Sequence, residues 1–87
     1  MIMELKELFE KAVTESKSLP EKPDNETLLQ LYSLYKQGSI GDVNTEPPAN
    51  PFDFVAKAKY EAWAAMKGKS TTDAMTEYID LIQKLKS

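Results

Sequence analysis

Two tyrosines and a lysine within five residues form the part of this chain best suited to binding chemistry. Tyr32, Tyr35 and Lys36 follow one another at helical intervals of three and four residues, so their side chains occupy neighbouring positions on one helix surface. Two phenol rings beside a fixed positive charge suit a ligand that combines a flat heterocycle with a phosphate group. Gly38 is predicted to end this helix, which places the patch in its last turn, where free carbonyl groups favour a cation.

A simpler interpretation of the same residues is also open. Tyrosines often lie between core and solvent with the hydroxyl group in water, and Lys36 could be a solvated surface charge. Lys59 precedes Trp63 by four residues, so its aliphatic stem could cover the indole ring without binding any ligand. Tyr78 shares a helical stripe with two isoleucines and could pack in the core. The residues alone therefore allow both ligand binding and ordinary packing.

Composition excludes several kinds of chemistry. The 87-residue chain contains no cysteine and no histidine, which excludes disulfides, thiolate nucleophiles, the usual zinc sites and histidine acid–base catalysis. Fourteen acidic and eleven basic residues give a net charge of −3, so binding to nucleic acid is not expected. No run approaches the ~20 apolar residues of a membrane span, and the N-terminus lacks a signal-peptide pattern. We expect a cytoplasmic protein without a cofactor or metal that does not insert stably into membranes.

Four stretches have the hydrophobic periodicity of amphipathic helices. We expect helices at about residues 3–17, 24–37, 51–67 and 71–86. Asp24, Asn50 with Pro51, and Ser70 are the expected starting signals of the last three. Residues 39–50 form a loop that is long for a compact helical domain. The pattern predicts one all-α domain over residues 1–87, a four-helix bundle with a long loop between helices two and three.

The second helix carries more apolar surface than one partner helix requires. Leu28 and Leu29 precede Lys36 by seven or eight residues, about 12 Å along a helix that rises ~1.5 Å per residue. An amphiphile with a fatty tail and a phosphorylated head could lie along this gradient from apolar to cationic. In the third helix, Val55 and Ala58 belong to the predicted packing stripe, and Trp63 is expected in the core.

Five short blocks resemble the acyl-CoA-binding protein family in their order and near-family spacing. They are Tyr-x-x-Tyr-Lys-Gln at 32–37, Gly-Asp at 41–42, Lys-Ala-Lys at 57–59 with Trp63, Lys-Gly-Lys-Ser at 67–70, and Asp-Ala-Met at 73–75 with Tyr78-Ile79. The match runs from about Phe9 to Leu85. The resemblance implies an up-down-down-up bundle whose long loop joins two parallel helices. It also implies a monomeric carrier that binds medium- and long-chain fatty acyl-CoA esters and catalyses nothing.

The resemblance further implies roles for individual residues in binding the nucleotide. Tyr32, Lys36 and Lys59 correspond to the residues that grip the 3′-phosphate of coenzyme A, a dianion that accepts charge-assisted hydrogen bonds. Tyr35 corresponds to the residue whose ring lies near adenine. Tyr78 corresponds to another nucleotide contact.

Residues for the apolar end of the ligand are less sharply indicated. Leu28 and Leu29 are candidates through their place on the second helix, and Phe9 and Val13 match family positions that line the acyl and pantetheine path. Plain core packing explains Phe9 and Val13 equally well. Lys17 is a further candidate, although a solvated surface charge also explains it.

Three features depart from the family pattern. Tyr60 stands where a tryptophan is usual beside the ligand lysine, residues 47–51 make the loop about one residue longer, and the chain stops at Ser87, before the usual tail.

Two other classes of function compete with a carrier. An acyl-CoA thioesterase would need a nucleophile or base, and the sequence contains no histidine, cysteine or Gly-x-Ser-x-Gly motif. A protein-binding helical module would place the tyrosines in a partner's groove and expose an apolar stripe. The chain could also be one domain of a larger protein, although Met1 and the complete four-helix pattern argue against this.

Overall fold

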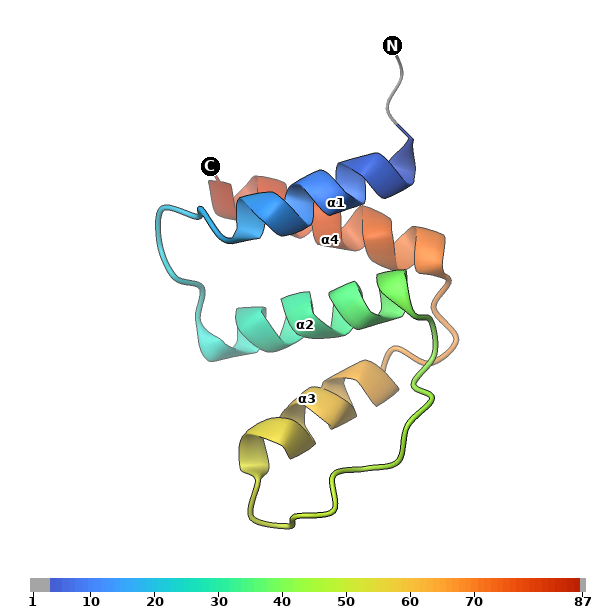
Figure 1. The fold of residues 1–87 in the computed structure, drawn as a ribbon. Coiled ribbons are helices and arrows are strands. Elements are labelled where there is room, and N and C mark those ends of the chain that lie inside the picture. The colour runs from blue at the N-terminus through green and yellow to red at the C-terminus, as the bar shows by residue number, and fades with distance from the viewer. Residues whose placement is uncertain (1–3, 87) are drawn as a thin grey trace.

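The computed structural model describes residues 4–86 and contains four helices: α1 (Leu5–Ser16), α2 (Asn25–Ser39), α3 (Phe54–Ala64) and α4 (Thr71–Lys86). Figure 1 shows that α1 and α4 run in one direction and that α2 and α3 run in the other. The segment 40–53 travels back along α2, so that α3 starts at the same end of the molecule as α2. The predicted all-α bundle, with its up-down-down-up order and its long loop between α2 and α3, is confirmed.

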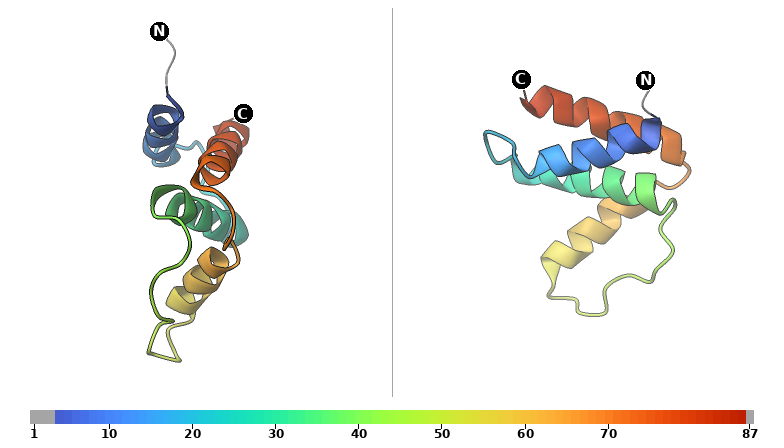
Figure 2. Two further views of the ribbon diagram at one scale, coloured as in Figure 1. Left: turned by 90° about the vertical axis from the view of Figure 1, so that its right-hand side faces the viewer. Right: turned by 45° about the horizontal axis from the view of Figure 1, so that its top comes forward.

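The helix α2 is central in the bundle, because it packs against α4 on one side and against α3 on another (Figure 2). The helix α1 packs against α4. The core is formed by buried side chains from α1, α2 and α4: Phe9, Ala12, Leu31, Leu34, Ala74, Tyr78 and Ile82. In α3, Trp63 is the buried residue, as predicted. Consequently α3 lies outside the main core and is attached largely through α2.

Two of the predicted helix starts are confirmed. Asp24 caps α2, where its Oδ1 accepts a hydrogen bond from the Thr27 amide at 2.8 Å. At the start of α4, Ser70 Oγ accepts from the Asp73 amide at 3.0 Å. Each bond satisfies an amide that would otherwise lack an intrahelical partner. The helix α1 starts at Leu5 in the structure, and the predicted start at residue 3 lies outside the described residues.

The start of α3 was predicted wrongly. Asp53, not Asn50, caps the helix, and its Oδ1 accepts from the Ala56 amide at 3.0 Å. Asn50 Oδ1 instead accepts from the Phe52 amide at 2.9 Å, in a turn before the helix. The helix also ends at Ala64, short of the predicted residue 67. Asn50 and Asp53 both have side chains that can cap a helix, and the local sequence did not discriminate between them.

The prediction that Gly38 ends α2 is also wrong, because the helix continues through it to Ser39. A Cβ atom at Gly38 would lie 3.2 Å from Met75 Cγ and 3.2 Å from Phe9 Cζ. A side chain at this position would crowd both neighbours, so glycine favours the close packing of α2 against α1 and α4. The chain turns at Gly41, whose φ of 104° is a left-handed conformation that favours glycine. Lys36 still lies in the last turn of α2, as predicted.

A buried amide joins the end of α2 to both segments that flank α3. Gln37 is fully buried, and its Nε2 donates to Asp42 Oδ1 at 2.8 Å and to the Lys69 carbonyl at 2.7 Å. Asp42 Oδ1 also accepts from the Gly68 amide at 2.9 Å. The Gly68 hydrogen bond, followed by that of Gln37, lowers the pKa of Asp42 below its usual value. These bonds give the Gln and Gly-Asp positions of the sequence blocks a role in shaping the loop.

Candidate functional site

Tyr32, Lys36 and Lys59 are brought together where α2 faces α3. Lys36 Nζ lies 5.7 Å and Lys59 Nζ lies 5.4 Å from the centre of the Tyr32 ring. Both distances are within the range of a cation–π contact. Two ammonium groups from different helices thus converge on one phenol ring. An anion with several oxygens can accept charge-assisted hydrogen bonds from both groups and offset their mutual repulsion.

Trp63 of α3 contacts both this cationic site and the long loop. Lys36 Nζ lies 5.7 Å from the Trp63 ring, and Trp63 Nε1 donates to the Gly41 carbonyl at 2.9 Å. The ammonium group near the Trp63 ring is therefore that of Lys36, while that of Lys59 lies near the Tyr32 ring. Beside the site is a hollow of about 250 Å³ between the loop and α3. Its lining includes Tyr32, Lys59, Tyr60 and Trp63.

Tyr60, at the position where the family pattern predicts a tryptophan, has a structural contact of its own. Its hydroxyl group donates to the Thr45 carbonyl at 3.1 Å, which ties the middle of the long loop to α3. A tryptophan carries its only polar donor on the indole ring and presents no hydroxyl group at this position. The substitution therefore keeps an aromatic ring beside Lys59 and adds a loop contact.

Tyr35 lies on the next face of α2, in a stack of three rings. Its ring centre is 6.0 Å from that of Phe9, with 24° between the planes, and Phe9 meets Tyr78 edge-on at 5.2 Å. Phe9 and Tyr78 are each 4% exposed, whereas Tyr35 is 39% exposed. Phe9 and Tyr78 are therefore core residues that also border the neighbouring hollows, and Tyr35 is the most exposed of the three rings. Burial raises the pKa of the Tyr78 phenol, partly offset by a hydrogen bond with Ser16.

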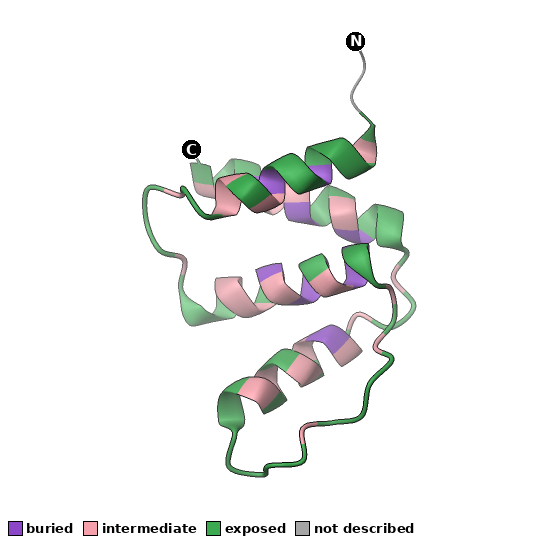
Figure 3. Cartoon of the chain, viewed as in Figure 1, coloured by how far each residue is buried: buried purple, intermediate pink, exposed green. Residues whose placement is uncertain are grey.

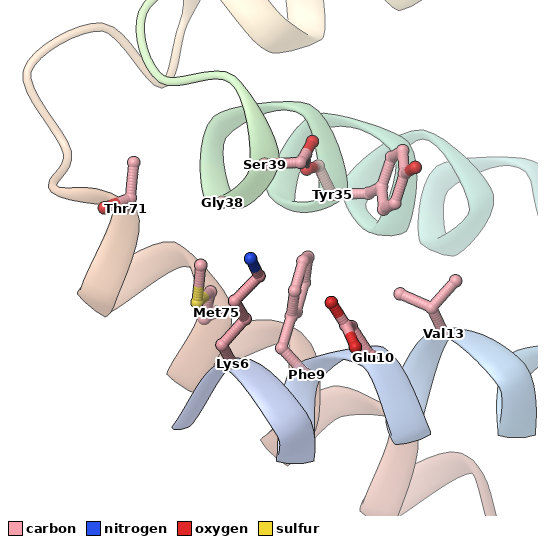
Figure 4. Close-up of a pocket in the computed structure, with 9 residues that line it drawn as sticks. All are labelled: Lys6, Phe9, Glu10, Val13, Tyr35, Gly38, Ser39, Thr71 and Met75. Atoms are coloured by element: carbon pink, nitrogen blue, oxygen red, sulfur yellow. Dashed lines mark hydrogen bonds between the residues drawn. The ribbon is translucent and has the colours of Figure 1, made fainter. Parts of the chain in front are cut away.

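Two hollows flank this ring stack between α1 and α2. One, of about 440 Å³, is lined by several predicted site residues, among them Val13, Lys17, Leu28, Tyr32, Tyr35 and Tyr78. The other, of about 480 Å³, shares Val13 and Tyr35 with the first and extends toward the start of α4. In Figure 4, Phe9 and Tyr35 point from α1 and α2 into the space between the helices, with Met75 of α4 beyond them. The two hollows share Val13 and Tyr35 and are together called the groove between α1 and α2 below.

A third hollow lies between α2 and α3 and is mostly apolar. Its volume is about 350 Å³, and its lining includes Leu28, Leu29, Phe54, Val55, Ala58 and Lys59. Leu28 also lines the groove between α1 and α2, whereas Leu29 does not line it. The predicted tail residues are therefore divided, with Leu29 facing α3, Phe9 and Val13 in the groove, and Leu28 between them.

Phe54 was not predicted as a site residue, and Val55 was assigned wrongly. Val55 is 67% exposed, so its predicted place on a packed stripe is wrong. Its side chain instead borders the hollow between α2 and α3, as does that of Phe54. The adjacent apolar residues Phe54 and Val55 cannot both lie on one narrow helix stripe, and this was the signal in the sequence.

Within residues 4–86, no group of three or more histidine, cysteine, aspartate or glutamate residues could hold a metal ion. No helix in that range is long and apolar enough to cross a membrane.

Comparison with known proteins gives consistent matches. Residues 6–82 match the family described as "Acyl CoA binding protein". Over 83 residues, which are 95% of this chain, it is 47% identical to an acyl-CoA-binding protein of Ricinus communis and 46% identical to one of Brassica napus; the matches cover 91% and 89% of those proteins.

Solved structures are similar over nearly the whole chain as well. The crystal structure of Oryza sativa Acyl-CoA-Binding Protein 2 superposes with a TM-score of 0.88 at 40% identity, covering 94% of this chain and 90% of that one. The crystal structure of ACBP from Moniliophthora perniciosa superposes with a TM-score of 0.85 at 35% identity, covering 98% and 82%.

Proposed function

Because the chain belongs to the acyl-CoA-binding protein family, whose members bind without catalysis, we propose that it carries medium- and long-chain fatty acyl-CoA esters in the cytoplasm as a monomer. One observation carries the assignment beyond the family match. The site where Lys36 and Lys59 converge on Tyr32 adjoins the apolar hollow between α2 and α3, and Lys59 borders both. A ligand that is anionic at one end and aliphatic at the other fits this combination.

We propose that the 3′-phosphate of coenzyme A binds Lys36, Lys59 and the Tyr32 hydroxyl group. A phosphate dianion is the strongest hydrogen-bond acceptor in the ligand, and charge-assisted hydrogen bonds are about twice as strong as neutral ones. The adenine ring then lies against Tyr35 in the neighbouring groove, where Val13, Lys17 and Tyr78 are further contacts. The half-exposed Tyr35 ring, supported by Phe9 behind it, offers a rigid face for stacking.

The acyl chain is assigned to the hollow between α2 and α3, with Leu28 and Leu29 on one side and Phe54 and Val55 on the other. Each methylene buried there contributes up to ~0.8 kcal/mol before ordering costs. Phe9 and Val13 are correspondingly reassigned to the nucleotide and pantetheine part of the ligand, because they line the groove that holds Tyr35. Burying the chain keeps a detergent-like molecule out of solution.

Calorimetric titration with palmitoyl-CoA, dephospho-palmitoyl-CoA and free coenzyme A tests this function. Palmitoyl-CoA should bind much more tightly than either of the other two, because each of them lacks one half of the recognised chemistry. The two mixtures that contain a thioester, assayed for free thiol, should show no hydrolysis. Equal affinity for palmitoyl-CoA and free coenzyme A would reduce the protein to a nucleotide binder and overturn the carrier proposal.

A further inference from the structure

The most exposed large apolar side chains in residues 4–86 lie together at the start of α3. Phe52 is 80% exposed, Phe54 is 72% exposed and Val55 is 67% exposed, ahead of Ile40 at 50%. Figure 3 shows the start of α3 and the adjoining end of the loop as exposed, on the side of the molecule away from both termini. Exposed apolar side chains that lie close together are typical of sites that bind another molecule or a membrane.

This apolar tip, consisting of Phe52, Phe54 and Val55, is continuous with the proposed tail site. Phe54 and Val55 also line the hollow between α2 and α3, whereas Phe52 contributes to none of the hollows described above. Given the proposed function, the molecule that enters the hollow is an amphiphile, and amphiphiles with long acyl chains concentrate at lipid surfaces. A tip that touches such a surface would bring the hollow's opening to the place where the acyl chain resides.

We propose that the apolar tip docks reversibly on zwitterionic lipid surfaces, so that an acyl-CoA passes between the bilayer and the hollow by direct contact. Aromatic and aliphatic side chains at the end of a helix are suited to shallow insertion at the boundary between headgroups and acyl chains. Burial of three such side chains, without a spanning helix, gives an association that forms and breaks readily. The inference rests on the proposed function, because the transferred molecule is its ligand.

Two properties of the tip favour zwitterionic lipid over other occupants. Asp53 and Lys57 lie beside the rings with opposite charges, and the whole chain has a net charge of −3. The protein therefore has little electrostatic attraction to an anionic membrane, whereas binding to a zwitterionic membrane does not depend on such attraction. Aromatic side chains bury roughly 150–250 Å² each, and the tip offers only two rings and a valine. That area falls below the ~800 Å² that each partner contributes to a stable protein interface, which disfavours a second copy of the chain.

Stopped-flow transfer of a fluorescent long-chain acyl-CoA from the protein to phosphatidylcholine vesicles tests the proposal. Contact transfer predicts a rate that rises with vesicle concentration. Phe52→Ser should lower that rise about tenfold, since burial of one phenyl ring favours association by about that factor or more. Its affinity for acyl-CoA, titrated without vesicles, should not change. Ile40→Ser, which removes an exposed apolar side chain at the opposite end of the long loop, should transfer like the wild type.

Several results would overturn the docking proposal. These are a rate independent of vesicle concentration, wild-type transfer by Phe52→Ser, vesicle dependence seen only with anionic phosphatidylglycerol, or self-association in sedimentation that Phe52→Ser abolishes. Flotation of the ligand-free protein with phosphatidylcholine vesicles is scored separately from the acyl-CoA titration. A protein that floats but binds no acyl-CoA would refute the proposed function, whereas one that binds acyl-CoA without vesicle contact would refute only the docking.

Discussion

Replacing Lys36 by alanine should weaken the binding of palmitoyl-CoA by roughly 1.5–3 kcal/mol, or about 10- to 150-fold. Lys36 Nζ and Lys59 Nζ lie 5.7 and 5.4 Å from the Tyr32 ring centre, so a phosphate bound there accepts hydrogen bonds from both. Lys59 remains in the variant, and the loss therefore corresponds to one charge-assisted interaction rather than to the whole site. Because Lys36 is only partly buried, salt and solvent should keep the loss toward the lower end.

The assay is a calorimetric cycle with two proteins and two ligands. Wild type and Lys36→Ala are each titrated with palmitoyl-CoA and with its dephospho counterpart. The difference between the two losses isolates the interaction of Lys36 with the 3′-phosphate, because any effect on packing is common to both ligands. Lys57→Ala is the matched control, since it removes an exposed lysine two residues before Lys59 and should change neither affinity.

A coupling near zero would refute the reasoning. Lys36 also lies over the Trp63 ring, and its truncation could disturb the site without any role for the phosphate. In that case the two ligands would lose the same free energy of binding. Raising the salt concentration gives a second readout: the phosphate contribution of the wild type should fall as ionic strength rises, and that of Lys36→Ala should fall less.

Three further predictions concern the adenine contact, the tail and the loop. Tyr35→Ala should cost roughly 1–3 kcal/mol of acyl-CoA affinity by calorimetry while Tyr35→Phe costs little; equal losses would exclude stacking. Affinity should rise with acyl length, and Leu29→Asp should weaken long esters more than short ones, so a flat dependence on chain length would exclude the tail site. Asp42→Asn should lower the melting temperature at pH 7. Since the folded-state pKa of Asp42 lies below the ordinary 3.8, its contribution is complete above that value and is lost as pH falls through the lower pKa. The difference in melting temperature between wild type and Asp42→Asn should therefore shrink below about pH 4. A difference that persists unchanged would contradict a stabilising role of the Asp42 carboxylate in its hydrogen bonds with Gly68 and Gln37.

Features that depend on local spacing were predictable from the sequence. Tyr32 and Lys36 are one helical turn apart, so their proximity follows from helix geometry alone. Asp24 and Ser70 were predicted as caps from their residue types and positions, and their amide partners lie only three residues ahead in the chain. Lys59 is different, because its approach to Tyr32 depends on how α3 packs against α2. Spacing suggested Trp63 as its neighbour, and only the family resemblance predicted that Lys59 lies with Tyr32 and Lys36.

Features that depend on tertiary packing were missed for identifiable physical reasons. Gly38 was predicted to end the helix because glycine commonly follows a helix terminus, yet the helix continues to Ser39 and a Cβ atom at Gly38 would lie only 3.2 Å from Phe9 and from Met75. Val55 was assigned to a packed stripe because apolar periodicity normally faces a core. At the first turn of α3 a hollow separates this helix from α2, so Val55 stays exposed.

The attachment of α3 has a consequence for the motions of the molecule. This helix packs largely against α2 and contributes only Trp63 to the buried side chains, so its backbone amides have little tertiary contact to hold them. Native-state hydrogen exchange should therefore find α3 opening at a lower free energy than α2 and α4, as a separate cooperative unit. A ligand whose acyl chain lies between α2 and α3 would contact both, and would raise the opening free energy of α3 as its concentration exceeds Kd. The bound acyl chain would then supply the tertiary contacts that α3 lacks in the free protein.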